Sequence, residues 1–466
     1  MSGPAAGGRP LNAAQLGVWY AQRLAPASQV FNMGGYVDLF GPVAPGLLAA
    51  TLAEVVAEDE TTRLRFTEVD GVPCQYLAPR EEYAVEVVDL RAEPDPVESA
   101  LGRIREDMSR VPDLEHGPLF HHELFQVGPE HIIWYNRAHH LIQDGYSGLL
   151  LRRRAGEIYA RLAAGADGQD PGTSFDSFWR VLDEQEAYEG SSAQRRDRAY
   201  WGRLMADAEC PPGPGAAEGA SYRIAREVSY VDRDTFERLR EFSERAGVSW
   251  QQALIGAAVL HRHRWTDESD VLLSLPVTGR LGTVGRWAPG MTANVLPLRC
   301  RATGDETCEE LVARVATQAL RAQWHQRYDA AALLRDLGWP ADGRRQFGPV
   351  INVLAGDDGA DFAGMASVAH LLSTGGTAED LAITVTRGPD EGLRVDFTVD
   401  AAYERVVDLA AQRRTFHRVI DAMTARPGVL VREVELLDAA ERELVLRTWN
   451  DTSVEIPERS LGDLFE

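Results

Sequence analysis

The chain has 466 residues, of which 44% are hydrophobic and 26% charged, and its formal net charge at pH 7 is −23. This length exceeds one ordinary hydrophobic core, so we expect a globular protein with two lobes. The negative charge argues against a nucleic-acid partner, because phosphate binding needs a basic surface. All 48 basic residues are arginine. Without lysine, the classes of Schiff-base enzymes and Walker A ATPases are excluded.

The sequence predicts neither a targeting segment nor a metal framework. Residues 1–9 are rich in glycine, proline and alanine and lack the apolar centre of a signal peptide. No apolar run reaches the length of a membrane span. The cysteines Cys74, Cys210, Cys300 and Cys308 are scattered, without the paired spacing of a metal site. We therefore expect a reduced, cytoplasmic protein that holds no metal.

Strands and helices are predicted to alternate in the first part of the chain, from hydrophobic periodicity and turn residues. In chain order these elements are a helix capped by Asn12, a strand at Phe31–Phe40, a helix at Pro45–Val56, a hairpin through Asp70-Gly71, a helix at Val97–Met108 and a strand at Leu119–Gln126.

The stretch that follows combines a strand, a polar turn and a helix. The β-forming run at His131–His140 predicts a strand, and Tyr146–Leu162 has helical periodicity. Strand side chains alternate between faces, so His139 and His140 are expected to point in opposite directions. Asp144 stands where a helix N-cap belongs. An imidazole at a strand end, near the positive end of a helix, is a candidate proton acceptor.

This local pattern also fits ordinary structural histidines. The preceding strand carries another pair, His121-His122, which no turn or carboxylate accompanies. We interpret that second pair as strand filler. For the pair at 139–140, the residues alone leave a catalytic and a structural interpretation equally open.

Composition shifts toward glycine, alanine and aspartate at 163–172, and a proline- and glycine-rich loop follows at 211–219, so we place the lobe boundary in this region. The elements predicted around and beyond the boundary were read from periodicity and capping boxes. They are helices at Phe175–Tyr188 and Ala193–Met205, a strand at Tyr222–Tyr230, helices starting at Asp234-x-x-Glu237, Ser249-x-x-Gln252 and Thr307-x-x-Glu310, a strand at Asp270–Pro276, a hairpin of Leu381–Thr386 and Leu393–Val399, and a last long helix at Val406–Met423.

The string His-His-x-x-x-Asp-Gly at 139–145 resembles the signature of the condensation domains of nonribosomal peptide synthetases, a superfamily that shares the fold of chloramphenicol acetyltransferase. Other segments resemble further motifs of the family in the same order, except a poorly matching fourth motif near Phe175–Phe178. The matching segments are Leu11–Tyr20 with Gln15 and Trp19, Asp59–Phe66, Pro289–Pro297 with Asn294, His325–Asp329 and Phe347–Val353. The residues of these motifs are most similar to those of condensation domains from siderophore synthetases.

The resemblance implies an α/β (α+β) fold of two chloramphenicol-acetyltransferase-like lobes, forming a V-shaped pseudodimer with a tunnel between them. The expected division is an N-terminal lobe at 1–175 with the signature, a C-terminal lobe at 176–438, and the start of a linker toward an adenylation domain at 439–466. The tail, with Trp449-Asn-Asp-Thr452, resembles that linker.

For mechanism, the resemblance implies amide-bond formation between a donor acyl or peptidyl thioester and an acceptor aminoacyl thioester. Both substrates arrive on 4'-phosphopantetheine arms of carrier proteins, so the domain itself binds no cofactor. The expected partners are an upstream donor carrier, a downstream acceptor carrier and the adjacent adenylation domain. The substrates and the oligomeric state are not implied.

The resemblance also implies roles for individual residues. His140 lies at the reaction centre, either as a general base or as a group that orients the amine. His139 is a packed structural residue, and Asp144 pairs with Arg280 of the second lobe. The remaining candidates lie beside or under the tunnel. They are Gly145, which has no side chain to narrow the tunnel, and the floor or tunnel residues Ser147, Asn294, Gln15 and Trp19.

Three other functions remain open at this point. A hydrolase built on Ser147, His140 and Asp144 is disfavoured, because Gly145-Tyr-Ser-Gly148 lacks the Gly-x-Ser-x-Gly elbow. An epimerization domain shares the His-His motif, but the adenylation-linker-like tail disfavours it. A non-catalytic carrier-docking module is the third alternative, and the intact motif argues against it.

Overall fold

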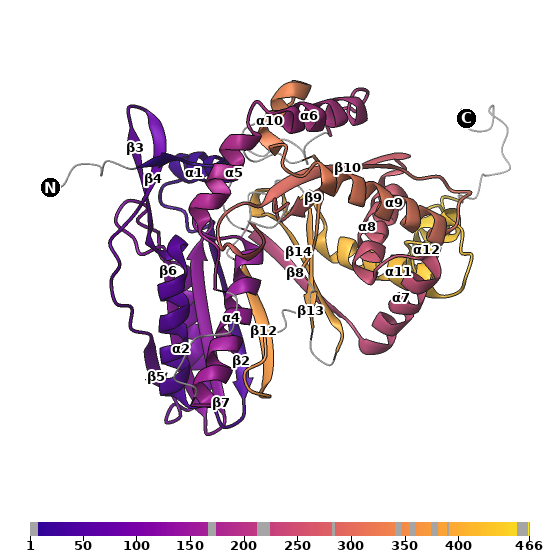
Figure 1. Ribbon diagram of the computed structural model, residues 1–466. Coiled ribbons are helices and arrows are strands. Elements are labelled where there is room, and N and C mark those ends of the chain that lie inside the picture. Colours follow the sequence, from indigo (N-terminus) through magenta and orange to yellow (C-terminus); the bar gives the residue numbers. More distant parts are fainter. Residues whose placement is uncertain are drawn as a thin grey trace.

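The computed structural model describes residues 8–165, 174–211, 224–281, 285–340, 347–354, 360–373, 381–388, 391–453 and 465. They form two lobes side by side, each built on one large sheet (Figure 1). The fold is thus mixed α/β, as the sequence predicted.

The N-terminal lobe contains a five-stranded sheet with helices on both faces. Its strands, in spatial order, are β12 (Ala366–Ser373), β2 (Asn32–Phe40), β7 (His131–His139), β6 (Phe120–Gly128) and β5 (Glu86–Asp89). Neighbouring strands are antiparallel except β5 and β6. Helices α2 (Pro45–Glu58) and α4 (Gly145–Ala163) bury their apolar sides against one face, and α3 (Pro96–Met108) covers the other. Two hydrophobic layers therefore hold β7, the strand that leads into the His-His turn.

A three-stranded sheet and helices complete this half of the molecule. The small sheet contains β1 (Arg9–Pro10), β4 (Val72–Leu77) and β3 (Leu64–Val69), and the helices are α1 (Ala13–Leu24), the 3₁₀ turn η1 (Glu60–Arg63) and α5 (Phe178–Tyr188). Helix α6 (Ser192–Leu204) packs instead on the C-terminal lobe, where Trp201 shares a hydrophobic cluster with Leu296 and Leu333. The predicted hairpin is confirmed, because Val69 pairs with Val72 across a two-residue turn. Asp70 and Gly71 both have positive φ, of 50° and 80°, as a type I′ hairpin turn requires of its two central residues.

The C-terminal lobe contains a six-stranded sheet covered by long helices. Its strands, in spatial order, are β10 (Asn294–Arg301), β9 (Asp270–Val277), β11 (Val350–Val353), β13 (Ala382–Arg387), β14 (Leu393–Asp400) and β8 (Ile224–Val231). The helices of this half are α7 (Arg233–Ala246), α8 (Trp250–Thr266), α9 (Cys308–Trp324), α10 (Ala330–Leu337), α11 (Leu409–Thr424) and α12 (Ala439–Glu443), followed by a π-helical turn at Leu444–Thr448. Residues of α7, α8, α9 and α11 share one hydrophobic core with the sheet.

One strand crosses between the two halves. Strand β12 comes late in the chain, yet it pairs with β2 at the edge of the N-terminal sheet, from Ala366 opposite Phe40 to Ser373 opposite Met33. Figure 1 shows this orange strand lying within the indigo and magenta lobe. The division into 1–175 and 176–438 remains our proposal, with this strand contributed by the second part to the first.

Several local predictions are confirmed. The capping boxes at Ser249 and Thr307 are present, and the hairpin of the C-terminal lobe forms between β13 and β14. Pro389 and Asp390 of its predicted turn lie outside the described residues, as do most of the loop at 211–219 and most of the tail beyond Ser453.

Two local predictions are wrong. The signature strand ends at His139 and not at His140, because the N–H groups of Ile142 and Gln143 already turn back and donate to the His139 carbonyl. Helix α7 is capped by Asp232 and not by Asp234, because β8 ends at Val231 and the Asp232 carboxylate accepts from the N–H of Thr235.

The pair in β6 belongs to the strand as interpreted, and one member, His122, is packed in the interior. It is 5% exposed and its Nδ1 accepts from Trp134 Nε1 at 3.2 Å. Burial lowers its pKa to about 3.

Candidate active site

The signature turn, residues 139–145, joins the end of β7 to the start of α4. Its backbone is fixed on the strand side, where the N–H of His139 donates to Leu119 at 2.8 Å and that of His140 to Phe31 at 2.9 Å. It is fixed on the helix side by Asp144, whose carboxylate accepts from the N–H of Ser147 at 3.0 Å. Asp144 is therefore the N-cap that the sequence predicted.

The two histidines of the turn lie in different environments. His139 is fully buried; its Nδ1 accepts from the N–H of Leu141 at 3.2 Å, and its Nε2 lies 3.3 Å from Gln22 Oε1. Burial lowers its pKa to about 3, so the ring is neutral at physiological pH. This side chain packs inside the lobe.

His140 is only partly buried, and its Nδ1 is a buried atom without a hydrogen-bond partner among the described residues. Burial lowers the pKa of the imidazole, against the opposing effects of the Asp144 charge and the Gln143 backbone. The ring is therefore neutral at pH 7, with one ring nitrogen not used by the protein.

A buried ion pair ties the signature turn to the C-terminal lobe. Arg280 Nη1 donates to Asp144 Oδ2 at 2.7 Å, and the two side chains are 4% and 1% exposed. Thr292 donates to the same oxygen from its N–H, at 3.2 Å. Burial alone would raise the pKa of Asp144, but the Arg280 guanidinium outweighs it and holds the pKa below its usual range. Asp144 is therefore an ionised structural anchor.

Ser147 also serves this anchor. Its Oγ lies 2.9 Å from Asp144 Oδ1, and it accepts from the N–H of Gly290 at 2.9 Å. A Cβ at Gly290, where φ is 152°, would lie 2.3 Å from the Phe178 ring, so only glycine allows this approach. Because the hydroxyl is held by the cap and by the Gly290 backbone, it has the surroundings of a structural group and not of a nucleophile.

Gln15 and Trp19 support the turn from inside the N-terminal lobe. Gln15 Nε2 donates to the carbonyl of Leu141 at 3.0 Å, and the residue is fully buried. Trp19 is 4% exposed and lies in the same hydrophobic cluster as Leu141. Both residues hold the turn in place.

Asn294, at the start of β10, organises a different segment. Its Nδ2 donates to the carbonyls of Gln326 and Tyr328, each at 2.8 Å, and its Oδ1 accepts from the N–H of Ala330 at 3.1 Å. The residue thus fixes the connection between α9 and α10, which is the segment that resembles the sixth motif.

Gly145, the first residue of α4, is exposed. A Cβ built there would meet only Leu354 among the described residues, at 4.0 Å. Packing within the described protein therefore does not require glycine at this position.

The sequence interpretation missed two residues that hold the turn. Gln143 is buried inside it, and its Nε2 donates to Oδ2 of the buried Asp59 at 2.7 Å. Asp59 belongs to a segment that resembles the second motif, but this pairing spans 84 residues. No local pattern signals such a contact.

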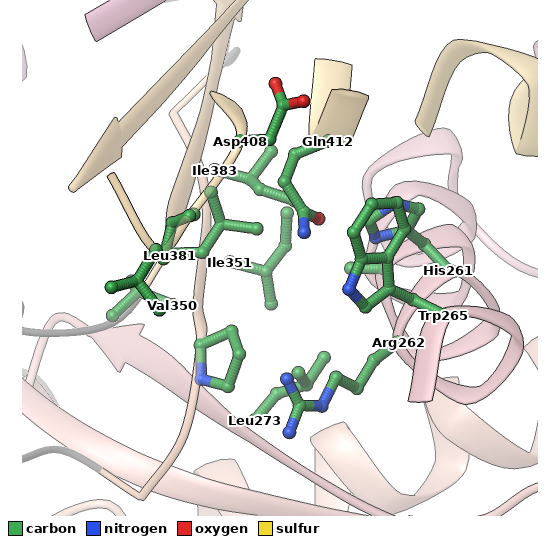
Figure 2. A pocket seen from close by; sticks show the side chains of 14 residues that line it. His261, Arg262, Trp265, Leu273, Val350, Ile351, Leu381, Ile383, Asp408 and Gln412 are labelled. Atoms are coloured by element: carbon green, nitrogen blue, oxygen red, sulfur yellow. The ribbon is translucent and has the colours of Figure 1, made fainter. Parts of the chain in front are cut away.

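Other features of the described residues lie apart from the turn. No group of three His, Cys, Asp or Glu side chains is placed to hold a metal, and no helix in that part of the chain is long and apolar enough to cross a membrane. A cavity of about 310 Å³ lies in the C-terminal lobe between α8, α11 and the sheet, lined by His261, Trp265, Ile351 and Gln412 among others (Figure 2). None of its lining residues belongs to the signature turn.

Known proteins of similar sequence are large synthetases. A dimodular nonribosomal peptide synthase of Bacillus subtilis (strain 168) is 32% identical over 458 residues, which cover 98% of this chain and 19% of that protein. Enterobactin synthase component F of Escherichia coli O157:H7 is 31% identical over 462 residues, or 98% of this chain and 35% of that protein. The chain thus spans about a fifth to a third of these relatives.

Solved structures of similar fold are single condensation domains. The first condensation domain of the calcium-dependent antibiotic synthetase, with a substrate analogue, superimposes with a TM-score of 0.82 at 30% identity, covering 93% of this chain and 100% of that one. A variant of the starter condensation domain of rhizomide synthetase, in complex with C8-CoA, gives 0.81 at 31% identity, covering 92% and 98%. The sequence model of the family named Condensation domain matches residues 6–446. The chain therefore belongs to the condensation-domain family of nonribosomal peptide synthetases, acyltransferases that form amide bonds.

Proposed function

We propose that His140 is the reaction-centre residue of this condensation domain. The observation that carries the proposal is its partly buried imidazole at the end of β7, with a depressed pKa and an Nδ1 that has no partner among the described residues. A neutral imidazole of this kind is suited to accept a proton from an attacking amine or to orient that amine. Because the thioester carbonyl is already activated toward attack by an amine, the reaction needs little further catalytic assistance.

The substrates in this proposal are a donor acyl or peptidyl thioester and an acceptor aminoacyl thioester, each on the 4'-phosphopantetheine arm of a carrier protein. The amine attacks the thioester carbonyl, a C–N bond forms, and the C–S bond breaks to release the donor thiol. The amine proton leaves by way of His140 or directly to solvent. The product stays on the acceptor carrier.

We place the arms in a tunnel between the two lobes, beside the signature turn. Gly145 supports this placement, because it is exposed and a Cβ built there would come no closer than 4.0 Å to any described atom. The Asp144–Arg280 pair would then hold the two lobes in register at the point where the arms meet.

The partners we propose are an upstream donor carrier, a downstream acceptor carrier and an adenylation domain, toward which residues 439–466 begin a linker. Multidomain relatives support this arrangement. A siderophore product remains a prediction, because an isonitrile lipopeptide synthase of Streptomyces coeruleorubidus, at 33% identity, matches the chain as well as enterobactin synthase component F does at 31%.

The test is reconstitution with separately loaded carriers, following product on the acceptor carrier by mass spectrometry. His140→Ala is expected to slow amide formation by about 10²–10⁴-fold, the usual contribution of general acid–base help, with an unchanged melting temperature. His116→Ala is the matched control, because this histidine has a 77% exposed side chain. A His140→Ala protein that condenses at the wild-type rate would refute the assignment.

A further inference from the structure

A buried carboxylate contacts the signature turn through Gln143, the neighbour of Asp144 in the chain. Asp59, between α2 and η1, is 1% exposed. Its Oδ1 accepts from the N–H of Thr61 at 2.9 Å and from the Thr61 hydroxyl at 2.6 Å. Its Oδ2 accepts from Gln143 Nε2 at 2.7 Å. The Gln143 amide is thus the one contact in this set that reaches beyond the local turn.

This carboxylate is unusual because no arginine of the described chain neutralises it. Burial raises its pKa to about 6, although the hydrogen bonds from Thr61 and Gln143 favour the ionised form. The neighbouring Glu58 is paired instead, with the buried Arg154 at 2.7 Å. A buried charge held by neutral donors alone is costly, and such groups concentrate at functional sites.

Gln143 connects this carboxylate to the reaction centre. Its N–H donates to the His139 carbonyl at 3.3 Å, and its own backbone lies against the His140 imidazole and affects the pKa of that ring. That contact lacks ordinary hydrogen-bond geometry, because His140 Nδ1 has no partner. The ring position is therefore set by the turn backbone, and the Gln143 side chain is one of the groups that fix this backbone.

We propose that Asp59 is a positioning residue for His140 and acts through the Gln143 amide. The ionised carboxylate orients the amide with its N–H₂ toward Asp59, and this fixes the turn beside the imidazole. The inference rests on the proposed role of His140. It adds a residue from a different segment of the lobe and a dependence of the rate on the ionisation of that residue.

The primary test is Asp59→Asn, which preserves shape but places either an amide N–H₂ or a carbonyl where only an acceptor was. We expect kcat to fall by about 10- to 100-fold, as expected for a displaced reacting group. The KM for either carrier should not change, because Asp59 is 1% exposed and a docked carrier cannot contact it. The ratio of wild-type to variant kcat should decrease as the pH falls through about 6, because the wild-type carboxyl then loses its charge as well.

Two further variants separate positioning from general damage. Asp59→Asn combined with Gln143→Glu restores an amide–carboxylate hydrogen bond with the roles exchanged, and should recover most of the lost kcat. Thr61→Val removes one hydroxyl bond to the same carboxylate but leaves the Gln143 contact. It should keep the plateau kcat and move the acidic limb of the pH profile upward.

A readout that does not depend on activity completes the test. The imidazole signals of labelled histidines, with that of His140 assigned by its loss in His140→Ala, should shift in Asp59→Asn and return in the exchanged pair. Unchanged His140 signals, or an Asp59→Asn enzyme with wild-type kcat and pH profile, would overturn the inference. If His140→Ala is fully active while the signals still shift, the proposed function fails and the positioning contact stands.

Discussion

At the residue scale, the charged groups around the signature turn differ in how they are compensated. Asp144 is paired with Arg280 and receives two N–H donors, so its ionised form is stable. Asp59 is equally buried but receives only neutral donors, and its pKa is raised to about 6. The Asp144–Arg280 pair therefore stabilises the folded protein. The buried Asp59 carboxylate orients the Gln143 amide but lowers the free energy of unfolding.

Asp144→Ala is predicted to destabilise the protein by about 3–5 kcal/mol, because it leaves the Arg280 charge buried and unpaired. The carboxylate has a depressed pKa, so its contribution is present above the unfolded pKa of 3.8 and is lost as the pH falls through the folded value. Denaturant unfolding at pH 7 therefore measures it in full. Asp95→Ala is the control: it removes an exposed cap of α3 and should cost only about 1 kcal/mol. Equal losses in both variants would contradict the role of the ion pair.

Asp59→Asn is predicted to have the opposite effect on stability. The folded pKa of about 6 lies above the usual 3.8, so the native state binds the additional proton and stability falls as the pH rises between these values. Two pKa units correspond to about 3 kcal/mol. The variant should therefore melt no lower than the parent at pH 7.5, and its advantage should vanish near pH 4. A large loss of stability at pH 7.5 would show that the carboxylate is structural.

At the scale of elements, the contact between β12 and β2 depends on glycine in β2. A Cβ at Gly35 would lie 2.9 Å from the carbonyl oxygen of His370, and one at Gly34 would lie 2.5 Å from the sulfur of Met108. The side of β2 at Gly35 therefore has no room for a side chain while β12 is paired. His370 adds a polar contact across the same strands, through Asp38 at 2.9 Å.

Gly35→Val is predicted to detach β12 from the N-terminal sheet. Overpacking of this kind costs about 1–3 kcal/mol, and the effect should be local, because β12 is an edge strand. Hydrogen exchange should show lost protection at 366–373 while the six-stranded sheet stays protected. Gly46→Ala in α2 is the control, because nothing lies within 4 Å of its added Cβ. Unchanged protection of β12 would show that β2 and β12 accommodate the valine side chain and stay paired.

At the scale of the whole molecule, the net charge of −23 bears on how carriers dock. Part of the arginine content is already paired inside the fold: Arg154 is 3% exposed between Glu58 and Glu157. Arg195 and Arg196 of α6 are exposed, whereas Arg344 and Arg345 lie outside the described residues. Arg195 and Arg196 thus form one exposed arginine pair that an acidic partner could contact.

Carrier association is predicted to depend weakly on ionic strength, or to accelerate with added salt. The family resemblance implies acidic carriers. Because an acidic carrier and this acidic domain would repel at long range, docking is expected to use local apolar and arginine contacts. Stopped-flow measurement of the on-rate for carrier binding across a salt series checks this. Free aminoacyl thioesters should also be poor acceptors in the condensation reaction, because they lack the carrier contacts. A steep fall of the on-rate with salt would show that a basic patch steers the encounter.

The sequence by itself determined the local structure of the site. The β-forming run before His139, the cap at Asp144 and the periodic helix after it are properties of neighbouring residues, so the strand, turn and helix could be predicted. The matching motifs gave the family and its expected fold. The Asp70-Gly71 hairpin was predictable for the same local reason.

Apart from the Asp144–Arg280 pair, only the tertiary structure decided which distant residues meet at the turn. Arg280 reaches Asp144 across 136 residues, a pair that the family resemblance supplied, whereas Gln143 and Asp59 lie 84 apart and were missed. Strand β12 joins the opposite lobe in the same way. Periodicity tells which side of an element is buried, but not which other element buries it. Burial, and with it the pKa of Asp59 and of His140, is set by that choice of neighbours.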